Sequence, residues 1–455
     1  MISSSSLQLL LYLTLMRMLM LMLITTTLTA TLTVTASSTD DNGEDGKEVD
    51  FPPILDADDI AYFSENHDIE GLHWALSNVF QRSKRNILQS QIKYPDLPQI
   101  LVARGGGDTY ATQYKLEMDL EQIKYLVDQH QLLSAEQEEY FVNQVIPIYQ
   151  KVLDRIPSLD QLAKTEGLYP FDRIDYENGI ASVYNKALHH TDYDVMIDDR
   201  GNVIPLLHDN FDAQCIENYW YGTHSNNHLC DKSNSHGQKG IVVIDDVLNP
   251  AALQRIRDLL NSSTVFYQTK MPLKFGGYVG AYIDDGLHDK LLLQLAFELN
   301  RAVPNIMNGH PLKYLWAYKY DSRYTGINTH ADQAAVNVNL WITPEDANMN
   351  KESGGLVIFT AKPPKDWDFD KYNKDADKVM KEILEPTGFA NMTVPYKENR
   401  AVVFDSALFH HTDEFSFKEG YENRRINLTI LYGDMNVDSA EGMRSTSGDQ
   451  DDGEL

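Results

Sequence analysis

The sequence has few cysteines and is short of basic residues. Only two of its 455 residues are cysteine, Cys215 and Cys230, so a disulfide-rich scaffold is excluded. Lysine and arginine number 39 against 67 aspartates and glutamates, which gives a formal net charge of −28. Because such a polyanion repels phosphate backbones and anionic membrane surfaces, we exclude a general nucleic-acid binder. The same acidity favours a neutral or basic substrate.

The two cysteines admit two interpretations. In a secretory protein, Cys215 and Cys230 are expected to form one disulfide that closes a short loop. Alternatively, His224 and His228, which lie between them, would complete a four-ligand zinc site. The spacing matches no common zinc module, so the disulfide is the favoured prediction.

The ends of the chain differ in composition from its middle. Residues 1–39 contain no acid, and the apolar run from Leu7 to Ile24 is followed by a Thr/Ser-rich stretch. This pattern predicts a secretory signal, with an uncleaved signal-anchor or an organelle transit peptide as alternatives. We expect the protein in the secretory lumen or outside the cell, and any membrane contact only through that segment. Residues 40–50 are predicted to be an acidic linker, and residues 434–455 an acidic, disordered tail.

Three glycosylation sequons occur in the chain. Those at Asn261 and Asn391 suit a luminal glycoprotein, whereas the one at Asn427 falls in a predicted core strand and is expected to stay bare.

Residues 51–235 are predicted to form a mainly helical region. Ser134 and Gln137 form a capping-box pattern that opens a helix, and Pro147 is expected to kink it. The apolar residues of this region recur at helical spacing, which is typical of core-facing surfaces. His189 and His190 are interpreted as ordinary surface, and no residue of the region indicates its role.

The region from residue 236 to residue 433 is predicted to be an α+β domain. A buried strand, Ile241–Ile244, is followed by a helix capped by Asn249 and by a second helix that begins near Asp289. Short strands then dominate, with one insertion, Lys362–Tyr396, that carries a helix near residues 376–384. Helices followed by a series of strands favour a β-sandwich or barrel core. The predicted strands are Tyr314–Tyr320, Ala335–Ile342, Leu356–Phe359, Ala401–Phe404 and Arg425–Tyr432.

His330 and Asp332 are the first candidates for a metal site. On a strand, residues i and i+2 project from the same face, so an imidazole and a carboxylate there can reach one cation. The same His-x-Asp spacing also occurs at His190 and at His411, so by itself it is weak evidence.

The residues that follow His330-x-Asp332 distinguish it from the His-x-Asp pairs at His190 and His411. A strand leads into His410, which can complete the two-histidine, one-carboxylate triad of non-haem iron enzymes. Arg425 then begins another strand, and its guanidinium can pair in bidentate fashion with a carboxylate. No comparable series follows His190, and His411 lies too close to the end of the chain to be followed by one.

Residues 240–433, less than half of the chain, resemble the 2-oxoglutarate and Fe(II)-dependent dioxygenase superfamily, near its prolyl 4-hydroxylase-like branch. The resemblance rests on an ordered set of motifs: His330-x-Asp332, Gly354-Gly355, Ser406-x-Leu-x-His410 and Arg425-x-Asn427. It implies a double-stranded β-helix, that is, a distorted jelly roll, as the core of the domain.

The resemblance also implies roles for individual residues. His330, Asp332 and His410 would bind Fe(II), with no further catalytic side chain, and the main risk is a shift of one residue from His410 to His411. Arg425 would bind the distal carboxylate of 2-oxoglutarate, while its neighbour Arg424 would point to the opposite face. Other pocket candidates are Tyr320, Asn337, Asn339 and Asn427, although the asparagines could instead pair structurally or face solvent.

The activity implied is hydroxylation of a polypeptide or small molecule, with O2 and 2-oxoglutarate as co-substrates and succinate and CO2 as products. A demethylase or desaturase of the same superfamily has the same motifs. Two other classes stay open: a non-catalytic binding or scaffold domain, and a cupin-like protein with another metal, which would not need Arg425. The insertion, with Trp367, is a candidate lid over the substrate cleft. The sequence leaves the substrate and the oligomeric state open.

Overall fold

The computed structural model describes residues 57–82, 109–223, 230, 234–367, 369–374 and 376–435. The predicted leader and linker, nearly all of the predicted tail, and His224 and His228 lie outside these ranges. Among the helices within them, none has the length and apolar content needed to cross a membrane.

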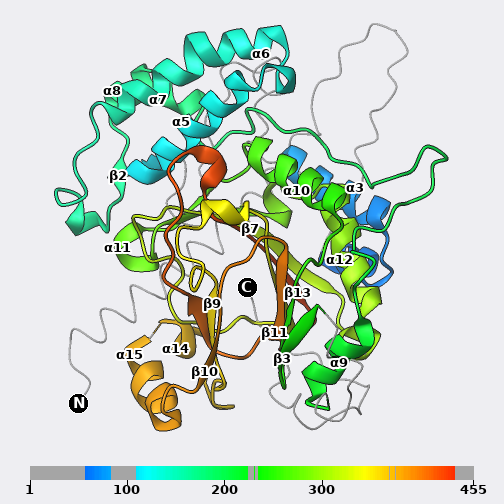
Figure 1. The fold of residues 1–455 in the computed structure, drawn as a ribbon. Helices are drawn as coiled ribbons and strands as arrows, with labels where there is room; N and C mark the ends of the chain where they lie inside the picture. The colour runs from blue at the N-terminus through cyan, green and yellow to red at the C-terminus, as the bar shows by residue number, and fades with distance from the viewer. Residues whose placement is uncertain are drawn as a thin grey trace, which may run out of the picture. The chain divides into compact units, whose positions relative to one another are not determined.

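Two antiparallel sheets form the centre of the described chain (Figure 1). The large sheet has eight strands in the order β3-β4-β11-β8-β13-β7-β6-β5, and the small sheet has the order β10-β9-β12. The strands are β3 Ser235–Gln238, β4 Ile241–Ile244, β5 Gln268–Thr269, β6 Tyr278–Tyr282, β7 Leu312–Tyr320, β8 Val336–Trp341, β9 Leu356–Phe359, β10 Asn391–Val394, β11 Arg400–Asp405, β12 His410–Thr412 and β13 Ile426–Tyr432.

The path of the chain between the sheets is that of a double-stranded β-helix. From β7 in the large sheet, the chain crosses to the small sheet at His330, which forms an isolated bridge with His410 of β12. It returns to the large sheet in β8, crosses again for β9 and β10, and then alternates through β11, β12 and β13. The predicted α+β fold with a jelly-roll core is therefore confirmed.

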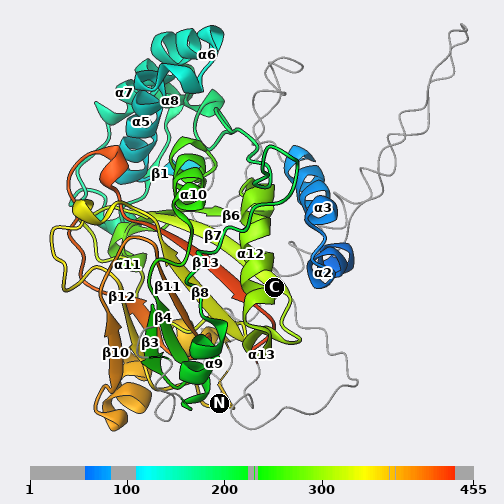
Figure 2. The ribbon, with the colours of Figure 1, turned by 45° about the vertical axis from the view of Figure 1, so that its right-hand side comes forward.

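The large sheet buries both of its faces. On one face, Trp341 and Phe404 pack against Leu356 and other apolar residues of the small sheet. On the other, Val338 and neighbouring residues pack against α10 (Pro250–Ser262) and α12 (Lys290–Ala302). Figure 2 shows these two helices on one side of the sheet, with β10 and β12 on the other. Because strands with two buried faces need apolar residues at nearly every position, β4 is a continuous apolar run, whereas β8 is interrupted by Asn337 and Asn339, and β13 by Asn427 and Thr429.

Helices from the first part of the chain extend this core. α3 (Ile69–Arg82), which follows α2 (Ala57–Glu65), contributes Leu72 and Leu76 to the cluster that contains α12. A second apolar cluster is formed mainly by α5 (Gln113–Asp128), α7 (Ile146–Leu153) and the segment around Val183. Outside the insertion, the remaining α-helices and short strands are β1 Tyr110–Ala111, α6 Ala135–Tyr140, β2 Tyr169–Pro170, α8 Arg173–Glu177, α9 Ala213–Tyr221, α11 Pro272–Phe275 and α13 Pro304–Met307.

Several local predictions are confirmed. Ser134 and Gln137 make the reciprocal hydrogen bonds of a capping box at the start of α6. The Asn249 side chain accepts from the Ala252 backbone N–H and caps α10. The helix that begins after Ser134 continues through a π-helical turn, Phe141–Val145, into α7, whose first turn contains Pro147; the kink at Pro147 stays a prediction.

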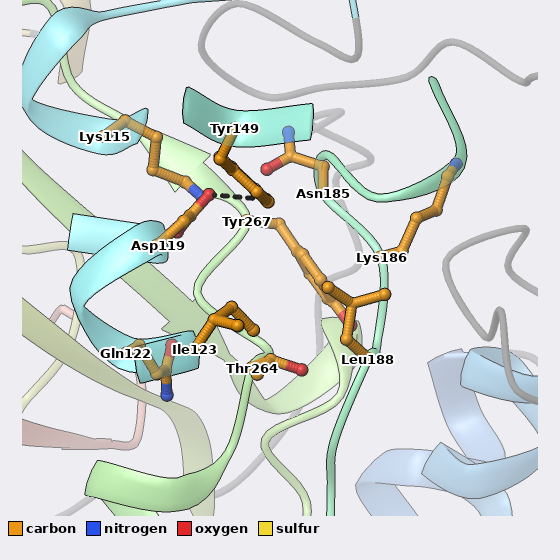
Figure 3. Close-up of a pocket in the computed structure, with 10 residues that line it drawn as sticks. All are labelled: Lys115, Asp119, Gln122, Ile123, Tyr149, Asn185, Lys186, Leu188, Thr264 and Tyr267. Atoms are coloured by element: carbon orange, nitrogen blue, oxygen red, sulfur yellow. Dashed lines mark hydrogen bonds and ion pairs between the residues drawn. The ribbon is translucent and has the colours of Figure 1, made fainter. Parts of the chain in front are cut away.

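A small cavity lies in the helical part of the chain, between α5, α7 and the segments near residues 186 and 265 (Figure 3). The Lys115 ammonium donates to the Asp119 carboxylate at 2.5 Å, and the Tyr149 hydroxyl donates to the same oxygen at 3.2 Å. None of the three predicted metal ligands, His330, Asp332 and His410, lines this cavity. We therefore assign it to packing.

The predicted C-terminal boundary of the insertion, Tyr396, is wrong. Its helix near residues 376–384 is present as α15 (Ala376–Val379) and a π-helical turn, Met380–Leu384, after α14 (Phe369–Lys374). However, Asn391–Val394 is strand β10, which pairs with β9, so the insertion ends before that strand rather than at Tyr396. Only Val394 of this strand is buried, so the sequence shows no apolar run there.

Cys215, on α9, and Cys230 form a disulfide with a Cα–Cα distance of 5.4 Å. The favoured interpretation of the two cysteines is therefore confirmed, and the zinc alternative is wrong because both sulfurs are joined to each other. One sequon prediction is also wrong for the folded chain: Asn261 is only 6 % exposed, since it lies in the last turn of α10 against the core. Asn391 is exposed and stays a predicted glycosylation site.

Removal of this disulfide is expected to lower the free energy of unfolding by about 3 kcal/mol, because the bridge closes a 15-residue separation in the unfolded chain. The measurement is urea denaturation of the Cys215→Ser/Cys230→Ser double variant against the oxidised wild type. The wild type under reducing conditions should unfold at the midpoint of the variant. Equal midpoints for the oxidised and reduced protein would contradict the expectation.

Candidate metal centre

The structure brings His330, Asp332 and His410 together. Their ligand atoms all lie within 4.8 Å of one another. The Nε2 atom of His330 lies 3.6 Å from Oδ1 of Asp332, and that of His410 lies 3.5 Å from Oδ2. Two nitrogens and a carboxylate are the ligand set of metal sites that keep coordination positions free for a co-substrate.

Backbone hydrogen bonds set this geometry. His330 and His410 exchange both of their backbone hydrogen bonds, at 3.0 and 2.8 Å, and the Asp332 N–H donates to the Ser406 carbonyl. The expectation that His330 and Asp332 share a strand is wrong, because His330 makes a single bridge and Asp332 lies in the irregular segment before β8. The Ser406-x-Leu-x-His410 motif thus holds the distal histidine against the first ligand pair.

A hydrogen bond from Nδ1 to a backbone carbonyl orients the ring of each histidine ligand. Nδ1 of His330 lies 2.8 Å from the Asn328 carbonyl oxygen, and Nδ1 of His410 lies 3.0 Å from that of Leu408. A carbonyl accepts only from a protonated nitrogen, so both rings carry a hydrogen on Nδ1, and a neutral ring then has its lone pair on Nε2. Metal-binding histidines are typically fixed in this way. Both lone pairs are on the atoms that approach Asp332.

The protonation states also suit a cation. Burial, with the nearby His410, lowers the pKa of His330 to about 4. Burial raises the pKa of Asp332, but His330, His410 and the Asn337 side chain outweigh it and leave that pKa below its usual value. Near pH 7, His330 is therefore neutral and Asp332 ionised, and these are the forms that bind a divalent metal.

His411 is not part of the group. Its Nδ1 lies 2.9 Å from the Thr412 carbonyl oxygen, and its ring packs near Phe359. His410 is 3 % exposed, and its ring packs edge-on against Phe404. The structure therefore favours His410 over the neighbouring residue.

The asparagines expected in the pocket form a hydrogen-bonded chain on the face of the large sheet that is turned toward the triad. Asn337 donates to Oδ2 of Asp332 at 2.7 Å, Asn339 donates to Asn337 at 2.6 Å, and Asn427 donates to Asn339 at 2.7 Å. Asn337 and Asn339 are thus paired with each other, as in the structural alternative. Their contact with 2-oxoglutarate stays a prediction. Asn427 keeps an Oδ1 that has no partner within the described residues.

Replacing Asn337 with alanine should weaken metal binding by about 10- to 100-fold, because this amide fixes the orientation of the Asp332 carboxylate. Calorimetric titration of Fe(II) or Co(II) under argon measures the affinity. Thr429→Val is the matched control: Thr429 bonds to the far end of the same chain, at Asn339, and should bind metal as the wild type does. Equal weakening in both variants would indicate a general loss of structure instead.

Arg425 is buried on the same face of the sheet. It is 1 % exposed, and it donates from Nε to the Gly354 carbonyl at 2.7 Å and from Nη2 to that of Gly355 at 3.2 Å. Its guanidinium carbon lies 4.5 Å from the centre of the Tyr320 ring. Nη1 has no hydrogen-bond partner in the described residues.

A buried guanidinium nitrogen without an acceptor is costly, because the group has been removed from water. A carboxylate placed there would remove that cost and neutralise the charge. The donor set of the triad and this unpaired nitrogen together fit Fe(II) with a dicarboxylate co-substrate. Arg424 points to the other face, as predicted, and bonds to Glu121 and Asp321.

The insertion contacts the segment from His330 to Asp332, which we call the metal loop. The sequence did not reveal this contact. The Asn373 side chain bonds to both the N–H and the carbonyl of Ala331, the residue between the two ligands, at 3.0 and 2.9 Å. Tyr372, Phe409 and Trp367 belong to the apolar cluster around Ala331. An asparagine far from its partner in sequence gives no pattern, so this contact could not be predicted.

Comparison with known proteins gives matches among solved structures alone: no family model and no curated protein matches the chain. A prolyl-4-hydroxylase of Pseudomonas putida is 14% identical, covers 43% of this chain and 92% of its own, and has a TM-score of 0.28. The epimerase SnoN, solved with Fe3+, α-ketoglutarate and nogalamycin RO, is 12% identical over 46% of this chain and 88% of its own, with a TM-score of 0.32.

A third match is an oxidoreductase of the 2OG-Fe(II) oxygenase family from Burkholderia pseudomallei, 12% identical over 43% of this chain and 85% of its own, with a TM-score of 0.28. The likeness is one of fold. It covers less than half of this chain, and all three TM-scores are below 0.5. The chemistry of the site therefore has to follow from its own side chains.

Proposed function

We propose that the chain is a 2-oxoglutarate- and Fe(II)-dependent oxygenase that hydroxylates a polypeptide or small-molecule substrate. One observation carries the proposal: two oriented imidazoles and a carboxylate converge on one point, and the large-sheet face turned toward them holds Arg425 with an unpaired guanidinium nitrogen. A protein that only binds or scaffolds does not need this combination, and a cupin-like metal site does not need the arginine.

Each group has a defined task in this proposal. When bound, iron(II) with 2-oxoglutarate and O2 supplies the oxidising chemistry, and succinate and CO2 are released. His330, Asp332 and His410 hold the metal from one side and leave the other side for the co-substrates. Arg425 pairs with the distal carboxylate, with Tyr320 against its guanidinium. Asn337 keeps the Asp332 carboxylate turned toward the metal.

A group of aromatic residues lies beside Arg425. On the large sheet, Tyr278, Tyr318 and Tyr320 form a buried aromatic group, with Trp316 and Tyr282 partly exposed at its edge. Because Tyr320 lies against the Arg425 guanidinium, this group limits water beside Arg425 and strengthens its charge pairing. We propose that the insertion, through its contact with Ala331, braces the metal loop and contributes to a lid over the substrate.

We further propose that the chain works in the secretory lumen or outside the cell, either free or tethered by its N-terminal segment. The disulfide Cys215–Cys230 supports this, since such bonds persist in oxidising compartments.

The test is succinate release by the purified chain supplied with Fe(II), 2-oxoglutarate and O2. We expect slow succinate formation without substrate, which stops when any one of the three is withheld. A screen of luminal polypeptides and small molecules should then identify compounds that accelerate it. Metal binding with no effect of 2-oxoglutarate would favour the cupin-like alternative, and failure to bind a metal would favour the non-catalytic one.

A further inference from the structure

A second group of potential metal ligands lies outside the triad. His190, Asp192 and Asp289 each offer one atom, and these atoms lie within 4.8 Å of one another. Nε2 of His190 lies 3.6 Å from Oδ1 of Asp192 and 3.6 Å from Oδ1 of Asp289. The interpretation of His189 and His190 as ordinary surface is therefore wrong: His189 is 5 % exposed, and the side chain of His190 is 12 % exposed.

The spacing of these atoms suits a cation better than direct hydrogen bonds. A separation of 3.6 Å is too long for a hydrogen bond between an imidazole and a carboxylate. Two ligand atoms bound to one tetrahedral metal at about 2.1 Å stand roughly 3.4 Å apart. The three side chains are therefore spaced as ligands around a centre.

Two polar atoms of these three side chains have no hydrogen-bond partner within the described residues. Asp289 is 1 % exposed, and its Oδ1 accepts from the Tyr193 N–H at 2.9 Å, but its Oδ2 has no donor. Nε2 of His190 is also without a partner. Because an unsatisfied buried carboxylate oxygen is strongly unfavourable, a bound group that the protein side chains do not supply would stabilise this carboxylate.

The surrounding structure orients the imidazole. Nδ1 of His190 lies 3.0 Å from the Ser263 hydroxyl, which follows α10, so that Nε2 faces the two carboxylates. The backbone beside it is fixed as well, since His189 and Thr264 exchange hydrogen bonds. Asp192 is 74 % exposed in its side chain and gives the group an opening to solvent. The arrangement thus has an oriented nitrogen, a fixed carboxylate and a route of entry.

We propose that His190, Asp192 and Asp289 form a second metal site, which takes a divalent ion of the zinc class. One imidazole with two carboxylates suits Zn2+ and its near neighbours, and a divalent charge balances the two carboxylates. Asp289 directly precedes α12, which packs on the face of the large sheet opposite to the triad. The site is therefore structural and independent of 2-oxoglutarate: it joins the segment of His190 and Asp192 to the start of α12.

The test isolates this site by disabling the first one. In the full-length His330→Ala/His410→Ala variant, calorimetric titration with Zn2+ should show one equivalent bound per chain, and Zn2+ should raise the melting temperature. Adding Asp192→Asn should weaken that binding by at least about tenfold, because a ligand is lost. Adding Asp289→Asn should abolish it. Asp192 is largely exposed, so its replacement leaves the fold intact even where that of the buried Asp289 does not.

Asp194→Asn is the matched control. Asp194 lies two residues from Asp192, has a similarly exposed side chain at 67 %, and pairs with Lys290 outside the group. Its replacement should leave Zn2+ affinity unchanged. Absence of Zn2+ binding in the His330→Ala/His410→Ala background would overturn the proposal, as would equal affinity of the Asp192→Asn and Asp194→Asn chains. Neither result depends on whether the triad supports catalysis.

Discussion

The His410→Ala variant is expected to lose succinate release that depends on 2-oxoglutarate by more than about a hundredfold. Groups that only orient metal ligands already contribute about 10- to 100-fold to metal affinity or activity, so the loss of a ligand has to exceed that range. His410 comes from β12, whereas His330 and Asp332 both precede β8, so the site is complete only when these distant segments meet. The assay is succinate formation at saturating Fe(II) and 2-oxoglutarate.

His411→Ala is the control for this prediction. The two histidines are adjacent, but the ring of His411 packs near Phe359 and lies outside the ligand group. Its replacement should leave succinate release within a few-fold of the wild type. If His411→Ala were inactive and His410→Ala active, the assignment would be wrong by one residue.

Arg425→Lys is expected to raise the KM for 2-oxoglutarate by roughly 30- to 150-fold, which corresponds to about 2–3 kcal/mol for a charged hydrogen-bonded pair. Lysine keeps the charge but cannot provide the fork of the guanidinium. The affinity for Fe(II) should stay within a few-fold of the wild type, because Arg425 bonds to Gly354 and Gly355 rather than to a ligand. The change is measured as succinate release against 2-oxoglutarate concentration, with anaerobic metal titration alongside.

Arg424→Ala tests whether the position of the charge matters. Arg424 lies next to Arg425 but bonds to Glu121 and Asp321 on the opposite face of the strand. Its loss should reduce the stability of the contact with α5 and leave the KM for 2-oxoglutarate unchanged. A similar rise of KM in both variants would mean that Arg425 makes no specific pair with the co-substrate, and a rise in Arg424→Ala alone would mean that net charge attracts it.

The sequence predicted the parts of this protein that rest on local patterns. Ile241–Ile244 and Leu356–Phe359 were predicted with the bounds that the structure has, because buried strands need an uninterrupted apolar run. The caps at Ser134 and Asn249 follow from side chains that bond to the backbone within three residues. His330, Asp332 and His410 could be chosen because an ordered series of motifs accompanied them.

Features that depend on residues distant in sequence could not be predicted. Strand β10 is paired on one edge only, and most of its residues are exposed, so it has no apolar pattern. The contact of Asn373 with Ala331 spans 42 residues, and that of His190 with Asp289 is longer still. Periodicity does not show that His190 of one segment meets the residue before α12. The mutual pairing of Asn337 and Asn339 likewise depends on how amides rotate once the sheet has formed.

Anaerobic addition of Fe(II) and 2-oxoglutarate to the purified chain tests the central claim most directly. A bidentate chelate at a two-histidine, one-carboxylate site gives a weak visible charge-transfer band. We expect this band in the wild type only when both components are present, with no band in His410→Ala and an undiminished one in His411→Ala. A wild-type chain that binds Fe(II) and 2-oxoglutarate without the band, or a His410→Ala chain that keeps it, would contradict the assignment of the metal centre.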